Sequence, residues 1–403
     1  MSDAHPDARL LVTVSGHDHP GITAALTSIL AASGAEILDM QQVAVQGRLS
    51  LSIVLAGDAS GTALLKDLLF AAKEHGSDLD FRVLGSRDMP AAARAPHVLT
   101  LLGDETLSAA ALAAVSGALA SHGINIEKIV RLSETRFATL EMTIGVPDES
   151  SLRAVRAALV QAAAAHDVDI ALQAEGLFRR AKRLVVFDLD STLLQGELID
   201  VLGAEHGVGE RIADVTRRAM GGEMDFATAL RERVALLAGM PLATVERAAA
   251  AATLMPGAAA LVAALRRLGF RTAIVSGGFA LAAESVRARL AIDWAFANEL
   301  EVAEGLLTGR VREPILDAAA KARIVRELAE STGITLDQVI AVGDGANDLP
   351  MLEIAGLGIA FNAHAAVRAR AQHHLNRPRL DSILFLLGIS EREVRALQSQ
   401  ETP

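Results

Sequence analysis

The sequence predicts an α/β domain with a parallel sheet, preceded by two smaller α+β domains. Residues 184–187, 271–275 and 339–343 are apolar runs that end next to carboxylates or glycines, as buried parallel strands do. Before residue 180, one order of strands and helices occurs twice. A chain of 403 residues also exceeds one compact core. We expect domains at residues 1–90, 91–180 and 181–403.

The strongest local signal is LVVFDLDSTLL, residues 184–194. Its apolar β-branched run predicts a buried strand that ends in Asp188 and Asp190. Ligands of open α/β sheets bind beyond the carboxyl ends of the strands. Two acids there can bind a hard cation and leave one oxygen free to attack an electrophile. The alternative is an ordinary strand-end turn rich in Asp and Ser.

Two later segments supply groups that suit a phosphate. RTAIVSGGF, residues 271–279, is a second apolar run and ends in Ser276, Gly277 and Gly278. A hydroxyl and flexible backbone N–H groups can surround an anion closely. Lys321 opens the helical stretch KARIVRELAE, where its ammonium can neutralise a phosphate oxygen or the attacking carboxylate.

A fourth segment adds oxygen ligands. VIAVGDGANDLP, residues 339–350, is a strand that continues into Asp344, Asn347 and Asp348. These side chains offer carboxylates for a cation and an amide for a substrate. Each segment alone has a structural explanation as a turn, a surface lysine or an Asp-rich loop. Their joint occurrence in this order favours one shared site.

The order of four motifs resembles that of the haloacid dehalogenase superfamily of aspartate-nucleophile phosphatases, over about residues 182–390. The motifs are D-x-D-x-T, S-G-G, K and G-D-x-x-N-D. The insert after the first motif is most similar to the phosphoserine phosphatases. In that family a helical cap, which the resemblance places at about residues 197–255 here, carries a Glu for the substrate ammonium and an Arg for its carboxylate. The matching positions are Glu197 and Arg233, and Arg can bind a carboxylate bidentately. Taken alone, they are a helix-start acid and a surface helix charge.

The resemblance implies hydrolysis of O-phospho-L-serine to L-serine and phosphate through an aspartyl-phosphate, within serine biosynthesis. Asp188 would be the nucleophile, and Asp190 would protonate the leaving oxygen and then deprotonate water. Ser276 and Lys321 complete the expected catalytic set. The residues expected to bind the substrate are Glu197, Met220, Phe226, Arg233, Ser276, Gly277, Lys321 and Asn347.

The implied cofactor is Mg²⁺, which suits an all-oxygen shell. Asp188, the backbone carbonyl of Asp190, and Asp344 are its expected ligands, and Asp348 would orient them without binding directly. Two alternatives stay open: another phosphatase or phosphotransferase of the superfamily acting on an amino-acid-like phosphate such as phosphothreonine, and an amino-acid sensor with a vestigial phosphatase half. The intact set of charged motif residues argues against the second.

The N-terminal residues contain an internal repeat. Segments that begin at Leu10 and His97 each show an apolar strand, a glycine-containing turn, an alanine-rich helix and a second strand. Each continues into an alternating strand and a second helix, near residues 61–75 and 150–166. The order βαββαβ is the ferredoxin-like pattern. Both copies resemble ACT domains, the small amino-acid-sensing modules attached to biosynthetic enzymes.

The two copies differ in the turn before the first helix. The first copy has GHDHPGI, whose glycines and helix N-terminus offer N–H groups for a carboxylate, while Asp18 suits an ammonium. The second has GDETLSA and lacks the Pro-Gly pair. We expect the first copy to bind the effector. Because the implied reaction makes serine, feedback sensing makes L-serine the candidate effector. The alternative is that L-serine, as the product, competes with the substrate at the active site. The expected effector residues are Gly16, His17, Asp18, Pro20, Gly21 and Ile22.

For His17 and His19 the alternative is a solvated turn. Ferredoxin-like units have exposed sheet edges that pair readily, so a homodimer or higher homo-oligomer through the ACT domains is expected. A net charge of −11 argues against non-specific nucleic-acid binding. The absence of cysteine excludes disulfides and zinc–thiolate sites. No apolar run has transmembrane length and MSDAHPDA does not read as a signal peptide, so we expect a cytoplasmic protein without membrane contact.

Overall fold

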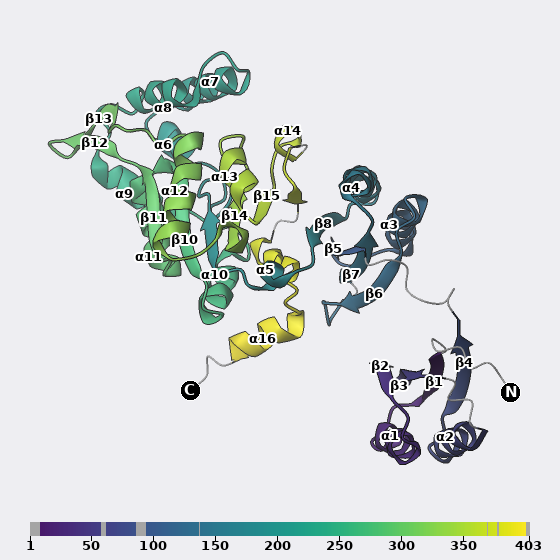
Figure 1. Cartoon of the computed structure of the whole chain (residues 1–403). Helices are drawn as coiled ribbons and strands as arrows, with labels where there is room; N and C mark the ends of the chain where they lie inside the picture. The colour runs from purple at the N-terminus through teal and green to yellow at the C-terminus, as the bar shows by residue number, and fades with distance from the viewer. Residues whose placement is uncertain are drawn as a thin grey trace. The chain divides into compact units, whose positions relative to one another are not determined.

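The computed structural model describes residues 9–57, 62–85, 94–136, 138–368, 370–376 and 379–399. The chain divides into two compact units, residues 1–93 and 94–403. The first unit holds one βαββαβ domain. The second holds another such domain together with a larger α/β domain, coloured teal to yellow in Figure 1.

The first unit is an antiparallel sheet of order β2-β3-β1-β4 with two helices on one face. Alternate residues of the first strand, Leu10, Val12 and Val14, are buried beneath the helices. This is the period-two pattern of a strand with one covered face. The elements are β1 (Arg9–His17), α1 (Ile22–Ser33), β2 (Ile37–Val45), β3 (Arg48–Ala56), α2 (Thr62–Glu74) and β4 (Asp78–Leu84).

The second βαββαβ domain has the same topology, with strand order β6-β7-β5-β8. Its elements are β5 (Ala95–Leu102), α3 (Ala109–Ser121), β6 (Ile126–Arg131), β7 (Thr139–Val146), α4 (Glu149–Ala165) and β8 (Asp169–Ala174). The expected ferredoxin-like repeat is therefore confirmed. The outer face of this sheet is covered, because Leu102 and Ala171 belong to the hydrophobic core of the α/β domain.

The α/β domain is built on a parallel sheet of order β11-β10-β9-β14-β15-β16. Its strands are β9 (Leu184–Phe187), β10 (Arg271–Phe279), β11 (Trp294–Asn298), β14 (Val339–Gly343), β15 (Leu357–Phe361) and β16 (His373–Leu375). The first strand in sequence, β9, lies between β10 and β14, so connections leave it in opposite directions. Such a switch point forms a crevice at the carboxyl ends of the strands.

Helices cover both faces of this sheet. In β9, Val185 and Phe187 face one core cluster, and Leu184 and Val186 face the other. This is why the strand reads as a continuous apolar run. The helices outside the cap are α5 (Leu177–Arg180), α10 (Ala258–Arg267), α11 (Ala280–Leu290), α12 (Ala318–Ser331), η1 (Leu336–Gln338), α13 (Leu349–Ile354), α14 (Ala365–Arg368), η2 (Leu380–Ser382), α15 (Ile383–Leu386) and α16 (Glu391–Ser399).

The cap consists of four helices between β9 and α10. They are α6 (Leu198–Glu205), α7 (Gly209–Met220), α8 (Phe226–Ala235) and α9 (Leu242–Ala251). A hairpin of β12 (Leu300–Ala303) and β13 (Leu306–Val311) joins the cap, because Leu307 exchanges backbone hydrogen bonds with Gly239 and Met240, each 2.8 Å. The sequence analysis did not predict this hairpin. Among the described residues, no helix combines the length and the apolar character needed to cross a bilayer.

Candidate active site

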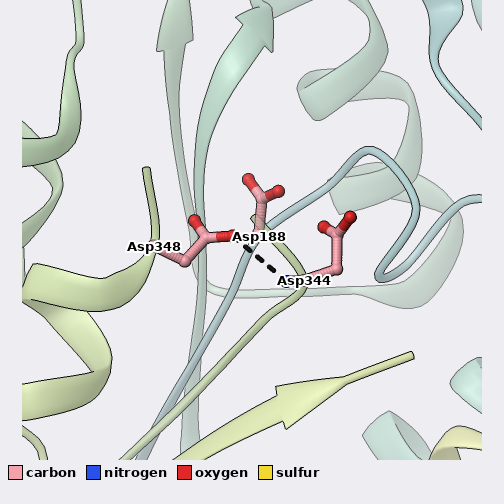
Figure 2. Close-up of side chains that lie close together, drawn as sticks. All are labelled: Asp188, Asp344 and Asp348. Atoms are coloured by element: carbon pink, nitrogen blue, oxygen red, sulfur yellow. Dashed lines mark hydrogen bonds between the residues drawn. The ribbon is translucent and has the colours of Figure 1, made fainter. Parts of the chain in front are cut away.

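Two neighbouring strands bring carboxylates together at one edge of the sheet. Asp188 follows β9 and Asp344 follows β14, and the Asp188 N–H donates to the Val342 carbonyl at 2.8 Å. Asp348 lies one turn beyond Asp344. Carboxylate oxygens of Asp188, Asp344 and Asp348 all lie within 4.8 Å of one another (Figure 2). The sequence prediction that these motifs share a site therefore agrees with their placement.

Lys321 joins two of these carboxylates. Its Nζ lies 2.6 Å from Asp188 Oδ1 and 2.6 Å from Asp348 Oδ1, and its side chain is fully buried. The helix that carries it, α12, begins three residues earlier than the sequence suggested, because the Asp317 side chain caps it at the Ala320 N–H. This capping by Asp317 places Lys321 in the first turn of α12, directed at the sheet edge.

Burial and mutual repulsion shift the proton affinities of this cluster. Burial, reinforced by Asp348 and partly offset by Lys321, raises the pKa of Asp188 well above its ordinary value. Burial and Asp348 raise the pKa of Asp344 to about 7. Burial alone would lower the pKa of Lys321, but Asp188 and Asp348 outweigh it and raise that pKa. Three carboxylates thus share one ammonium, and the excess negative charge calls for a further cation.

The donor set fits a hard divalent cation. All the available ligand atoms are oxygens, which is the preference of Mg²⁺. Asp188 and Asp344 have oxygens available for it. Asp348 is already engaged, since Oδ1 accepts from Lys321 and Oδ2 accepts from the backbone N–H groups of Asp344 and Gly345 at 3.1 and 2.9 Å. Thr192 Oγ1 donates to Asp344 Oδ1 at 3.3 Å and orients it.

Asp190 lies on the cap side of this cluster. Its Oδ1 accepts from the Leu198 N–H at 3.1 Å, at the start of the first cap helix. A Cβ on Gly278 would collide with Asp190 Oδ2, so glycine at 278 allows the two motifs to touch. Burial and the nearby charge of Glu197 raise the pKa of Asp190 to about 6, against the hydrogen bond from Leu198. A carboxyl group with that pKa can exchange protons near neutral pH.

The S-G-G segment at the end of β10 lies beside the cap. Ser276 is buried, and its Oγ accepts from the Gly278 N–H at 2.8 Å. A Cβ on Gly277 would lie 2.7 Å from Cζ of Phe226, so the ring rests directly on this backbone. Met220 behaves differently from Phe226. It ends α7 and is 69% exposed, so the structure does not bring it to the other predicted residues.

Glu197 and Arg233 form a pair in the cap. Arg233 Nη1 lies 3.3 Å from Glu197 Oε2, and Arg233 is only 9% exposed. Its Nε is buried and has no hydrogen-bond partner among the residues that the structure describes. Asp225 caps α8 at the Thr228 N–H. Phe226 and Arg233 both lie in this helix, two turns apart, and therefore share one face of it. Burial raises the pKa of Glu197, with Arg233 opposing the shift.

The G-D-x-x-N-D loop folds back on itself around Asn347. A Cβ on Gly345 would collide with Asn347 Oδ1, so the amide lies over the backbone of its own loop. Sequence reasoning missed Asn298, the last residue of β11. Its buried amide contacts the Gly277 carbonyl and the Leu316 N–H, at 2.8 and 2.7 Å. The available signal was a polar residue closing the apolar strand WAFAN, the same pattern as in the other motifs.

The predicted effector residues lie at the end of β1 and the start of α1. Gly16 and His17 are the last residues of the strand, and the Asp18 N–H donates to the Gly47 carbonyl at 2.9 Å. Pro20 and Gly21 form the turn, Gly21 has a φ of 108°, and Ile22 is buried in the domain core.

His19 is more ordered than a solvated turn residue. Its Nε2 lies 2.9 Å from the His75 carbonyl oxygen, and the two imidazole rings stack with centroids 5.2 Å apart.

Three segments of the chain match known protein families. Residues 185–353 match the haloacid dehalogenase-like hydrolases, and residues 8–82 and 95–173 each match the ACT domains. The phosphoserine phosphatase of Mycobacterium tuberculosis is 44% identical over 391 residues, covering 96% of this chain and 95% of its own. The phosphoserine phosphatase of Streptomyces coelicolor is 42% identical over 391 residues, covering 96% and 94%.

A solved structure agrees with these relatives. A haloacid dehalogenase family hydrolase from Salmonella enterica serovar Typhi matches 72% of this chain and 98% of its own, with 28% identity and a TM-score of 0.63. Identity of 42–44% along nearly the whole chain shows that the chain belongs to the phosphoserine phosphatases, and its own haloacid dehalogenase-like hydrolase domain is preceded by two ACT domains.

Proposed function

We propose that this enzyme hydrolyses O-phospho-L-serine to L-serine and phosphate through an aspartyl-phosphate intermediate. One juxtaposition supports the proposal best. A buried carboxylate held by a lysine, Asp188 with Lys321, lies on the sheet side, and an acid–arginine pair, Glu197 with Arg233, lies in the cap. The first pair suits attack on phosphorus, and the second suits a zwitterionic amino acid. The domains would be residues 1–90, 91–180 and 181–403.

Asp188 is the nucleophile in this proposal. Lys321 bonds to its Oδ1, which leaves Oδ2 to attack phosphorus in line with the serine oxygen. Asp190 protonates that oxygen as the phosphorus–oxygen bond breaks. It then takes a proton from the water that hydrolyses the aspartyl-phosphate. A pKa of about 6 suits both tasks, because the group can hold and release a proton at neutral pH.

The phosphoryl oxygens carry the charge of the transition state, so fixed donors lower its energy. The donors in the proposal are the Ser276 hydroxyl, the Gly277 N–H, Lys321 and Asn347. Mg²⁺ bound by Asp188, the carbonyl of Asp190, and Asp344 would neutralise further phosphoryl charge. Asp348 acts by holding Lys321 and the 344–345 backbone in place.

The cap selects the amino-acid part of the substrate. Glu197 accepts the ammonium group, and Arg233 grips the carboxylate with its fork of N–H donors. No described residue hydrogen-bonds to the buried Nε of Arg233, and a substrate carboxylate would satisfy it. Phe226 covers the Gly277 backbone and excludes water from the phosphoryl group.

Phosphate release from O-phospho-L-serine, with and without Mg²⁺, tests the proposal. Phosphothreonine and p-nitrophenyl phosphate serve as matched substrates, the first with an extra methyl group and the second without ammonium or carboxylate. We expect Mg²⁺-dependent turnover with a clear preference for phosphoserine. Equal turnover of phosphoserine and p-nitrophenyl phosphate would contradict the assigned cap, and turnover independent of divalent cations would contradict the assigned metal ligands.

We further propose that L-serine binds the first ACT domain, at Gly16, His17, Asp18, Pro20, Gly21 and Ile22, and that the ACT domains mediate homo-oligomerisation. The helix ends support the first part. Among the described residues no side chain caps α1, so its first N–H groups can bind a carboxylate. In the second copy the Ser108 side chain already accepts from the Ala111 N–H of α3.

A further inference from the structure

Asn298 connects the end of β10 with the segment before α12, although it does not belong to any of the motifs. It ends β11, is 3% exposed, and lies at the carboxyl edge of the sheet beside β10. Its Nδ2 donates to the Gly277 carbonyl at 2.8 Å, and its Oδ1 accepts from the Leu316 N–H at 2.7 Å. A buried amide that satisfies two backbone groups is held in one orientation.

The donor arm of this amide acts on Ser276. The Gly277 carbonyl shares a peptide plane with the Gly278 N–H, because the peptide bond is planar. Fixing that carbonyl therefore also fixes the N–H, which donates to Ser276 Oγ at 2.8 Å. Since the Ser276 oxygen accepts this hydrogen bond, its own proton is directed elsewhere and can be donated to an anion.

The acceptor arm acts on the loop before Lys321. Leu316 immediately precedes Asp317, whose side chain caps α12 at the Ala320 N–H. That cap sets the position of Lys321 in the first turn of the helix. One side chain thus links the end of β10, which carries Ser276, to the start of α12, which carries Lys321. Both elements carry donors that the proposed mechanism places on the phosphoryl group.

We propose that Asn298 is a positioning residue for phosphoryl transfer, which keeps the Ser276 hydroxyl and the Lys321 ammonium in register without touching the substrate. This inference rests on the proposed function. A shift of about 1 Å in positioned groups can lower a rate on the order of 10²-fold. The loss in catalysis should therefore exceed what the loss in stability alone would cause.

The chain offers a matched control at the other end of the same two strands. Asp293 precedes β11, and its Oδ2 accepts from the Thr272 N–H and Oγ1 in β10, at 2.8 and 3.1 Å. Asp293→Ala removes the hydrogen bonds between the start of β11 and the start of β10, at the end of these strands that lies away from the site. We expect Asn298→Ala to lower kcat/KM about 10²-fold and Asp293→Ala to change it less than about twofold. Thermal unfolding of both variants shows whether their losses of stability are comparable.

Asn298→Asp isolates the donor arm. The new carboxylate still accepts from Leu316 but cannot donate to the Gly277 carbonyl, whereas the protonated carboxyl group can. The ratio of variant to wild-type kcat/KM should therefore rise roughly tenfold between pH 8 and pH 5. Orthophosphate binding, measured by calorimetry, should weaken in the same variant at pH 8 and recover at pH 5.

Equal losses in the two alanine variants, or an Asn298→Asp ratio that does not change with pH, would overturn the positioning role. All ratios are relative to wild type and are measured on p-nitrophenyl phosphate as well as phosphoserine. If wild type prefers another phosphate ester, the proposed substrate is wrong, yet the ratios still decide the role of Asn298.

Discussion

The proposed catalytic site and the predicted effector loop both lie where a strand ends and the chain turns, yet they use opposite physical means. At the catalytic site, Asp188 is 5% exposed and Lys321 is fully buried, so each charge depends on fixed partners. In the effector loop, Asp18 and His17 are exposed, and the groups offered to a ligand are backbone N–H groups at the start of α1. Buried charges with shifted pKa values suit bond breaking. Exposed groups that remain solvated suit reversible binding.

The contrast is tested most directly at the proposed nucleophile, Asp188. Asp188→Asn keeps the shape of the side chain but removes the attacking charge. Turnover of phosphoserine should fall on the order of 10⁴-fold or more while the fold survives. Asp18→Asn is the matched control in the effector loop and should leave turnover within about twofold. Acid quench during turnover, followed by peptide mapping, should locate phosphate on Asp188. Phosphate found on another residue would refute the assignment of Asp188 as the nucleophile.

Specificity should depend on Arg233 rather than on the neighbouring arginine of the same helix. Arg233→Ala leaves a substrate carboxylate unpaired, at a cost of about 2–5 kcal/mol in transition-state binding. Hydrolysis of p-nitrophenyl phosphate, which has no carboxylate, should suffer much less. Arg231→Ala is the control, because Arg231 pairs with Glu313 on the exposed side of α8. Equal losses on both substrates would mean that Arg233 only holds the cap together.

Cation binding should follow the protonation of the carboxylate cluster. Because the fold raises the pKa values of Asp188 and of Asp344, to about 7 for the latter, their protonated forms are favoured. Their contribution to stability is present below pH 4 and is lost as the pH rises through 7. Bound Mg²⁺ reverses this loss, so the increase in Tm on adding Mg²⁺ should grow from pH 5.5 to pH 8.

Proton competition at Asp344 alone predicts Mg²⁺ binding that is on the order of tenfold or more weaker at pH 5.5 than at pH 8. Calorimetric titration of the metal-free enzyme at the two pH values measures this ratio. Asp344→Asn serves as the control, because it removes the titrating group and should weaken Mg²⁺ binding at both values. A Mg²⁺ affinity that does not change with pH would disprove the assignment of Asp344 as a ligand.

The motifs were predictable because each one is local. A buried strand followed at once by Asp188, Ser276 or Asp344 can be read from a few residues, and parallel strands bring their carboxyl ends to one edge. The hairpin of residues 300–311 was not predictable, because its contact with Gly239 and Met240 joins segments far apart in the sequence. Asn298 shows the local pattern of a polar residue that closes an apolar strand, but its partners, Gly277 and Leu316, are seen only in the structure.

The two ACT copies show the limit of pattern reading most clearly. Their helices and strands were predicted with equal success, but their outer sheet faces differ in environment. In the first unit Ser50 points outward and is exposed. In the second copy Asp169 accepts from Asn376 and the Gln173 amide donates to the Leu386 carbonyl at 2.9 Å, so this face is attached to the hydrolase domain. The sequence of a strand does not reveal which domain packs against its outer face.

The smallest catalytic effect is expected at the effector loop, and it sharpens the contrast between chemistry and sensing. Asp18→Ala should abolish the response to L-serine that is not competitive with phosphoserine, and should leave kcat and KM without serine within about twofold of wild type. Glu105→Ala is the matched control, since Glu105 occupies the corresponding turn of the second copy and pairs with Arg136. It should leave the serine response intact. Serine is also the product, so competition at Glu197 and Arg233 is the competing explanation, and only a response tied to Asp18 requires a second site. Inhibition that stays purely competitive in the full chain and is unchanged in Asp18→Ala would show that the loop does not sense serine.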